Sequence, residues 1–421
     1  MHTLYLCYFG LREPLVQTQV LPYLRELMRD GVRVTLLTFE PDRRRAWTDE
    51  AAAEWTEALA AEGIRWTSLP YHKRPSLPAT VYDILVGAAV AARIVRRDRI
   101  DVLHGRSHVA TAMGALAKAI TGARLVFDIR GFNAEEYVDA GRWRAGGLKF
   151  RLTKRAERAI FPAADGFVVL TERARDILFP AGLAGDGTAR PVEVIPCCVD
   201  LNRFAVLDPE ARDRSRRELG LDGRRGIVYL GALGGWYMTA EMADFFATAV
   251  RQDPTTKAII LTQSPPEMMA EPLRRRGVAE SDFLIRKVVP ADVPFFLAGC
   301  DVALSFITPC YSKISSSPTK MAEYLASGLP VVCTAGIGDV DQVVTDDQVG
   351  VLVHEMNEAS YLEALRQVDK LQREGGLAER CRATAQRRFD LESVGGVRYR
   401  RLYRRIFEGA PNGASEAAGG R

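Results

Sequence analysis

The sequence predicts an α/β protein built from two Rossmann-like, doubly wound parallel-sheet domains that face each other across a cleft. Three observations carry this prediction. Short apolar runs alternate with segments of helical periodicity, the series starts again near the middle of the chain, and 421 residues suit two domains at about 100–200 residues each. The proportions of 47% apolar and 26% charged residues are typical of a folded globular protein.

The strands of the first domain, residues 1–189, are expected at 4–9, 32–39, 100–103, 123–129 and 166–170. Each is a continuous apolar run, as in strands that are buried on both faces of a parallel sheet. Helical spacing of apolar residues predicts helices at 20–28 and 108–120. A loop rich in Gly, Ala, Asp and Thr at 183–190 ends this domain.

The strands of the second domain, residues 190–390, are expected at 192–195, 226–230, 258–262, 283–288, 302–306, 330–333 and 350–353. Residues 391–408 have apolar positions at helical spacing and predict a last helix that packs back toward the first domain. Residues 409–421 are rich in Gly, Ala and Ser and predict a flexible tail. Because ligands bind beyond the carboxyl ends of strands in open α/β sheets, we expect the site in the interdomain cleft.

Charge and cysteine content exclude several classes of protein. The net charge is only +4, which gives no reason to expect a nucleic-acid partner. Seven cysteines without zinc-ligand spacing predict neither a disulfide framework nor a zinc site, so we expect a cytoplasmic protein. The longest apolar stretch, residues 84–95, is interrupted by Arg93 and is shorter than a membrane span. The first residues also lack the apolar core of a signal peptide.

The most informative segment is ISSSPTKMAEYLASGLPVVCT, residues 314–334. Ser317 is suited to an N-cap and Pro318 to the first helical position. The free N–H groups at the start of such a helix, with Lys320 one turn inside, suit a phosphate. Glu323 lies about two turns, or roughly 9 Å along the helix axis, from the N-terminus of this helix. At that distance a carboxylate can bind the vicinal hydroxyls of a sugar while the helix end binds the phosphates. The segment therefore predicts a nucleoside-diphosphate site, with an ordinary capped helix as the alternative.

This segment resembles the donor-binding helix of retaining GT-B glycosyltransferases, in particular glycosyltransferase family 4. Residues 323–332, EYLASGLPVV, match the family's helix end and strand entry. Further stretches that match are GLREPLVQTQVLPYLREL (10–27), VLHGRSH (102–108), FDIRGFNAEEYVDAGRW (127–143), VVLTERARDIL (168–178) and VIPCCVDLNRF (194–204). Together these stretches cover both domains in the family's order.

The resemblance implies a retaining, metal-independent transfer of a sugar from a nucleoside-diphosphate sugar to a glycan or lipid-linked acceptor, in the synthesis of bacterial surface polysaccharide or glycoconjugates. No cofactor is expected. Three residues are expected to be catalytic: Glu323, Lys320 and Arg130. The donor side is expected to comprise Gly10, Gly231, Gly234, Gly235, Arg286, Ser315, Ser316, Ser317, Thr319, Lys320 and Glu323. The acceptor side is expected to comprise His104, Arg130, Glu135 and Glu136.

The sequence departs from the family pattern at three places. Ser315 replaces the first of two glutamates, and Arg130 replaces a histidine. The loop YLGALGGWYMTAEM (229–242) lacks the Arg and Lys that bind the donor diphosphate in many members, so Lys320, Arg286 and Lys287 are the candidates for that charge. Two alternatives therefore stay open: a nucleotide-sugar-binding subunit without turnover, and a nucleotide-sugar 2-epimerase.

Two further patterns have competing interpretations. The glycines at 231–235 suit either a tight turn or a phosphate loop, but a full G-x-G-x-x-G is absent, which disfavours a nicotinamide enzyme. Asp339 and Asp341 resemble a D-x-D metal clamp, and we assign them to structure, with no metal site expected.

The segment RWRAGGLKFRLTKRAER (142–158) combines basic and apolar residues. Such a segment is either an ordinary solvated helix or a peripheral contact with an anionic membrane surface. Nucleic-acid binding is the least favoured interpretation, because nothing in the sequence suggests a base-reading module.

Overall fold

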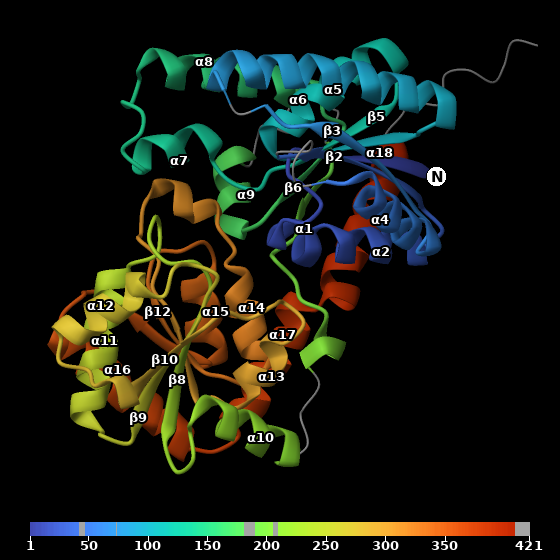
Figure 1. Ribbon diagram of the computed structural model, residues 1–421. Helices are drawn as coiled ribbons and strands as arrows, with labels where there is room; N and C mark the ends of the chain where they lie inside the picture. The colour runs from blue at the N-terminus through green and yellow to red at the C-terminus, as the bar shows by residue number, and fades with distance from the viewer. Residues whose placement is uncertain (42–46, 73, 181–189, 205–208, 409–421) are drawn as a thin grey trace, which may run out of the picture.

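Two parallel β-sheets organise the chain into two lobes (Figure 1). The computed structural model describes residues 1–41, 47–72, 74–180, 190–204 and 209–408. The first sheet has seven strands in the order β3-β2-β1-β4-β5-β6-β7, and the second has six in the order β10-β9-β8-β11-β12-β13. The predicted fold class of two doubly wound parallel-sheet domains is confirmed. The expected tail at 409–421 and the loop at 183–189 lie outside the described residues.

The first lobe alternates strands and helices along the chain. Its strands are β1 (His2–Cys7), β2 (Arg33–Glu40), β3 (Ile64–Pro70), β4 (Val102–Arg106), β5 (Arg124–Asp128), β6 (Gly166–Val169) and β7 (Val192–Val194). Its helices are α1 (Pro14–Gln19), α2 (Leu21–Arg29), α4 (Asp49–Ala61), α5 (Ser76–Asp98), α6 (Ser107–Thr121), α7 (Asn133–Asp139), α8 (Leu148–Ile160), η1 (Phe161–Ala163) and α9 (Glu172–Leu178).

The second lobe repeats this alternation. Its strands are β8 (Arg225–Leu230), β9 (Thr256–Leu261), β10 (Phe283–Arg286), β11 (Val302–Ser305), β12 (Val331–Thr334) and β13 (Gly350–Val353). Its helices are η2 (Leu201–Phe204), α10 (Pro209–Leu219), α11 (Thr239–Gln252), α12 (Glu267–Arg275), η3 (Glu280–Asp282), α13 (Val293–Ala298), η4 (Tyr311–Ser315), α14 (Thr319–Ala326), α15 (Val340–Asp347), α16 (Glu358–Arg373) and α17 (Leu377–Phe389). A π-helical segment, η5 (Leu391–Gly396), leads into α18 (Val397–Glu408).

Two strands differ from the sequence expectation. The residues of β3 were not expected to form a strand, because their sequence lacks the apolar run typical of a central strand. In the structure only Ile64 of this strand is buried. The segment beginning at Val192 was expected to open the second series, but it pairs with β6 and completes the first sheet. Its three residues are too few to show on their own which sheet they join.

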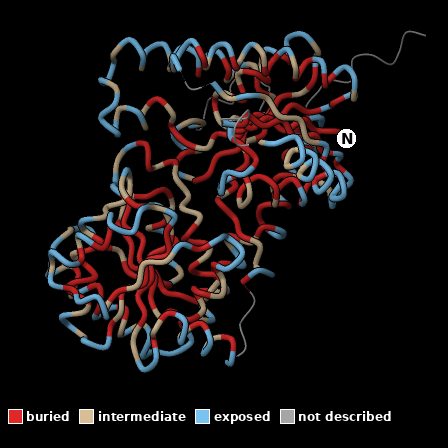
Figure 2. Tube along the Cα trace, in the orientation of Figure 1, coloured by how far each residue is buried: buried red, intermediate tan, exposed pale blue. Residues whose placement is uncertain are grey.

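The strands form the buried centre of each lobe (Figure 2). The last helix, α18, returns to the first lobe, where Tyr399, Leu402, Tyr403 and Ile406 join the core around β1. In Figure 1 this red helix lies among the blue elements of the N-terminal sheet. The chain therefore crosses between the lobes twice, once before η2 and once through η5.

The helix α5 is longer than the apolar stretch seen in the sequence. Residues Leu77–Asp98 are long and apolar enough to cross a membrane by length and composition alone, although 44% of the apolar window is buried in the protein. The buried face, which includes Ala88, Ala91 and Val95, packs in the core with β1, β4 and α6. The helix is thus an outer layer of the first lobe, with one face left uncovered.

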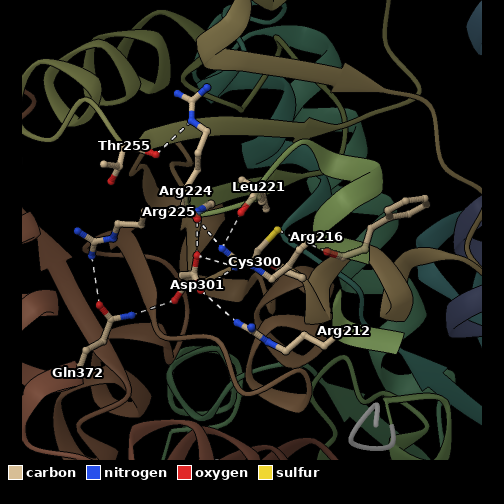
Figure 3. A network of polar contacts seen from close by, with 12 residues as sticks. Arg212, Arg216, Leu221, Arg224, Arg225, Thr255, Cys300, Asp301 and Gln372 are labelled. Atoms are coloured by element: carbon tan, nitrogen blue, oxygen red, sulfur yellow. Dashed lines mark hydrogen bonds and ion pairs between the residues drawn. The ribbon is translucent and has the colours of Figure 1, made fainter. Parts of the chain in front are cut away.

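At the amino-terminal edge of the second sheet, Asp301 organises a polar network (Figure 3). Its carboxylate accepts hydrogen bonds from the backbone N–H of Gly226 at 2.8 Å and from Arg212 at 3.1 Å, and it pairs with Arg216 at 3.2 Å. These contacts tie β8, β11 and α10 together at the edge opposite to the carboxyl ends of the strands. The network stabilises the lobe and leaves the other edge for a ligand.

Candidate functional site

A buried lysine lies at the start of α14, where the second sheet faces the first lobe. Lys320 is only 7% exposed, and no residue in the described part of the chain forms a hydrogen bond with its Nζ. The ammonium lies 4.2 Å from the ring centre of Tyr229 and 4.1 Å from that of Tyr237. Burial lowers the pKa of Lys320 to about 7, and the charge of Glu323 opposes that shift. A buried, unpaired amine costs stability, which indicates a role in binding an anion.

The loop after β8 covers this lysine. Gly231 has a φ of 130°, and a Cβ there would lie 2.9 Å from the Nζ of Lys320, so glycine allows the close approach. Gly234 and Gly235 also adopt positive φ angles, as a tight turn requires. The N–H of Gly234 donates to the hydroxyl of Thr239 at 2.9 Å. The amide of Gly234, a residue expected on the donor side, is therefore bound to the first residue of α11.

Glu323 lies on the wall of a pocket of 420 Å³ between the lobes. Thr319 lines the same pocket, together with Arg203 and with Gln17 and Thr18 of α1. Burial raises the pKa of Glu323 to about 7, against the opposing charges of Arg203 and Lys320. Glu323 and Lys320 lie on one helix, α14, as expected from the sequence.

The serines before α14 act mainly as links between the lobes. The hydroxyl of Ser315 accepts from the backbone N–H of Phe132 at 3.1 Å. The hydroxyl of Ser317 accepts from the N–H of Cys197 at 3.1 Å, so it is not the expected N-cap. The helix begins at Thr319, with Pro318 at the cap position, one residue later than predicted. Ser316 lines a second interlobe pocket of 350 Å³.

Arg286, expected on the donor side, has other partners. It pairs with Glu218 of α10 at 3.2 Å and lies 4.4 Å from the ring centre of Phe296 of α13. Lys287 is exposed. Gly10 packs against Glu40 and Pro41, leaving no room for a side chain, and helps to seat the loop after β1.

The first-lobe wall is built on a buried carboxylate. Asp128, at the end of β5, pairs with Arg130 at 3.5 Å and with Arg106 at 3.6 Å, and it accepts from the hydroxyl of Tyr399 at 3.2 Å. Although burial alone would raise the pKa of Asp128, the adjacent Arg130, His104 and Arg106 hold it well below its usual range. Arg130 also reaches the Sγ of Cys197 at 3.4 Å.

His104 does not face the cleft as expected. Its side chain is fully buried, and its Nδ1 lies 2.9 Å from the hydroxyl of Tyr403 on α18. Burial lowers the pKa of His104, so the imidazole is neutral at neutral pH. The reason is that β4 continues to Arg106, so His104 lies within the strand, where the returning helix α18 covers it.

The two lobes touch through α7 and η4. Glu136 pairs with Lys313 at 3.2 Å, and Asp139 accepts from the N–H of Ser312 at 2.8 Å. Figure 1 shows α7 and α9 on the side of the first lobe that faces the second. Glu135 instead pairs with Lys154 of α8 at 3.0 Å, within its own lobe. Of the two glutamates expected on the acceptor side, Glu136 therefore forms an ion pair with the second lobe, whereas Glu135 forms its ion pair within the first lobe.

Both aspartates of the D-x-D string have structural partners. Asp339 accepts from the backbone N–H of Glu172 at 2.7 Å and of Arg173 at 3.3 Å, and so caps α9 from the opposite lobe. Asp341 accepts from the N–H of Gly336 at 2.8 Å. Within the described part of the chain, no group of three or more His, Cys, Asp or Glu side chains is arranged to hold a metal ion.

Sequence reasoning missed several residues of this region, namely Lys313, Trp236, Tyr237, Arg203, Arg106 and Asp139. In the sequence, Trp236 and Tyr237 stood out only as neighbours of the glycines at 231–235. Their contacts with Lys313 and Lys320 join residues about 80 positions apart, which the sequence does not predict. The one available signal was the proximity of Lys313 to the 314–334 segment.

Family models match both lobes. The model described as Glycosyltransferase Family 4 matches residues 16–203, and the model described as Glycosyl transferases group 1 matches residues 224–369. No curated protein sequence matches the chain significantly.

Solved structures share the whole architecture. A glycosyltransferase from Rickettsia africae superposes with a TM-score of 0.73 at 14% identity, covering 97% of this chain and 99% of that chain. The Anabaena protein HepE in complex with UDP gives 0.68 at 18% identity, covering 96% and 100%. Sucrose-phosphate synthase from Thermosynechococcus elongatus gives 0.72 at 16% identity, covering 97% and 100%. With both lobes matched in order by family models and by these folds, the chain is a GT-B glycosyltransferase of the family 4 type.

Proposed function

We propose that the protein transfers a sugar from a nucleoside-diphosphate sugar to a glycan or lipid-linked acceptor, with retention of configuration and without a metal ion. The observation that carries the proposal is that α14 bears two ionisable side chains at this place. Glu323 lies in the interlobe pocket, and Lys320 is buried beside Gly231 with no hydrogen bond from any described residue. The structures of HepE with UDP and with UDP-glucose support a nucleotide sugar as donor.

The chemistry divides between these two side chains. Glu323 accepts hydrogen bonds from donor hydroxyls, and the ammonium of Lys320 stabilises the negative charge that develops on the diphosphate. The bond between C1 of the sugar and the diphosphate oxygen breaks, and its electron pair stays on that oxygen. A new bond forms from C1 to the acceptor oxygen on the same face. The acceptor proton passes to the departing diphosphate.

Metal independence is supported by the engagement of the aspartates. Asp339 and Asp341 both accept backbone hydrogen bonds, so each carboxylate already has a structural role. The charge that a cation would supply is assigned to Lys320.

We further propose a peripheral location on the cytoplasmic side of the membrane and a role in bacterial surface glycan synthesis. The outer face of the first lobe supports the contact with a membrane. The helix α5 exposes Leu77, Val81 and Leu85 at 60%, 48% and 58%. The helix α8 exposes Leu148 at 71% beside basic side chains. An exposed apolar stripe next to basic residues suits an anionic lipid surface, where a lipid-linked acceptor would be found.

The test of the transfer reaction is incubation with UDP-, GDP-, ADP- and dTDP-sugars and a bacterial lipid extract as acceptor, in EDTA. We expect release of a nucleoside diphosphate from one donor class and a product with the donor's anomeric configuration by NMR. Loss of activity on chelation, restored by magnesium or manganese, would contradict the metal-free mechanism. Inverted configuration would contradict retention, and an altered sugar still attached to its nucleotide would indicate an epimerase.

A further inference from the structure

Two lysine ammonium groups lie against one aromatic loop at the carboxyl edge of the second sheet. Lys320 contacts Tyr237, and the Nζ of Lys313 lies 4.2 Å from the ring centre of the adjacent Trp236. The loop with the aromatic residues follows β8, whereas Lys313 follows β11, and these two strands are paired neighbours. Both lysines are only 7% exposed. The fold therefore places two buried lysine side chains against Trp236 and Tyr237, which are consecutive residues of one loop.

The two charges are balanced differently. Among the described residues the amine of Lys320 finds no hydrogen-bond partner, whereas that of Lys313 has an ion pair with Glu136 at 3.2 Å. Glu136 belongs to α7 of the opposite lobe, and its side chain is 37% exposed. The carboxylate can therefore turn into solvent at little cost, while the ammonium, being buried, needs an anion in its place.

We propose that Lys313 is a second donor-binding residue, which exchanges Glu136 for the donor diphosphate and, with Lys320, supplies the positive charge at the leaving group. This inference rests on the proposed function and adds to it a residue and a coupling between the lobes. Two ammonium groups on the neighbouring rings of Trp236 and Tyr237 suit an anion with charge on two phosphate groups, because lysine binds phosphate as a point charge. The carboxylate of Glu136 is then released from Lys313.

The experiment compares a nucleoside diphosphate with its nucleoside. Binding of UDP, GDP and ADP, and of uridine, guanosine and adenosine, is measured by calorimetry on the wild-type protein and on Lys313→Met. For the nucleotide that binds best, we expect Lys313→Met to weaken diphosphate binding at least tenfold and to leave nucleoside binding unchanged. Lys370→Met, an exposed lysine on α16 of the same lobe, is the control and should bind like the wild type.

Glu136→Gln distinguishes an exchangeable partner from a structural bridge, and it also serves if Lys313→Met does not fold. Because Glu136 competes with the diphosphate for Lys313, its neutralisation should tighten diphosphate binding. A weaker affinity in Glu136→Gln, or an unchanged ratio of diphosphate to nucleoside affinity in Lys313→Met, would overturn the assignment of Lys313 while the proposed function stands. Absence of binding of every diphosphate to the wild-type protein would overturn both.

Discussion

Lys320 and Glu323 have pKa values that burial moves toward each other. Burial lowers the pKa of Lys320 and raises that of Glu323, each to about 7, and the charge of each opposes the shift of the other. Both groups change charge near neutral pH as a result, and their titrations are coupled. A site that needs an ionised carboxylate and a protonated amine is therefore most active in a narrow range of pH.

The dependence of kcat/KM for the donor on pH should accordingly be bell-shaped, with its maximum near neutrality. Below the maximum Glu323 becomes protonated and loses its capacity to accept hydrogen bonds from two hydroxyls; above it Lys320 loses its charge. Glu323→Gln should remove the acidic limb and cost at least about 1.5 kcal/mol in transition-state energy. Lys320→Met should remove the alkaline limb. Initial rates from weakly acidic to weakly alkaline buffers measure both, and variants that keep both limbs would contradict these roles.

Lys320 should also reduce the stability of the folded protein. Its folded pKa lies below that of an unfolded lysine, so its burial is most costly below pH 7, and the cost falls as the pH rises above 7. The aromatic contacts offset part of that cost. Lys320→Met should therefore raise the free energy of unfolding at weakly acidic pH by about 1–3 kcal/mol, although the variant loses activity. Urea denaturation measures this effect, with Lys370→Met as control; a destabilised Lys320→Met would indicate a structural lysine instead.

At the scale of elements, α9 depends on a residue of the opposite lobe. Its first N–H groups donate to Asp339 and to the hydroxyl of Thr171, which itself donates to the backbone carbonyl of Ile314 at 2.9 Å. Asp339→Ala should lower the free energy of unfolding by about 1–2 kcal/mol, as for loss of an N-cap. Asp346→Ala, at a side chain that is 52% exposed on α15, the helix that follows Asp339, is the control. Equal stability of both variants would show that the cap contributes nothing.

The elements also show which parts of the fold the sequence can predict. Central strands such as β8 and β11 are continuous apolar runs, so their positions follow from burial on both faces. The half-exposed β3 lacks that signal. Helical spacing was enough to place Lys320 and Glu323 near one another on α14. It could not predict that Ser317 would bind Cys197, because that contact joins residues 120 positions apart across the lobes.

At the scale of the whole molecule, α5 and α8 form one outer surface of the first lobe. Figure 1 shows both helices along the same side, and Figure 2 shows their outward faces exposed. The exposed basic side chains of α8 are those of Lys149, Arg151, Arg155 and Arg158, whereas Lys154 pairs with Glu135 and Glu157. Each basic residue near an anionic membrane contributes about 1 kcal/mol, and the apolar stripe of α5 adds to that attraction.

We therefore expect the protein to float with anionic vesicles at low salt and to be released at high salt, because the electrostatic attraction is screened over about 8–10 Å. Replacing Lys149, Arg151 and Arg155 by Glu should abolish flotation. Replacing Leu77, Val81 and Leu85 by Ser should weaken flotation at low salt, because apolar insertion adds to the electrostatic attraction. The matched control reverses three exposed basic residues of α16, Arg366, Lys370 and Arg373, and should float like the wild type. Equal flotation with neutral and anionic vesicles, or an α16 variant that is released as readily as the α8 variant, would show that this surface does not bind the membrane.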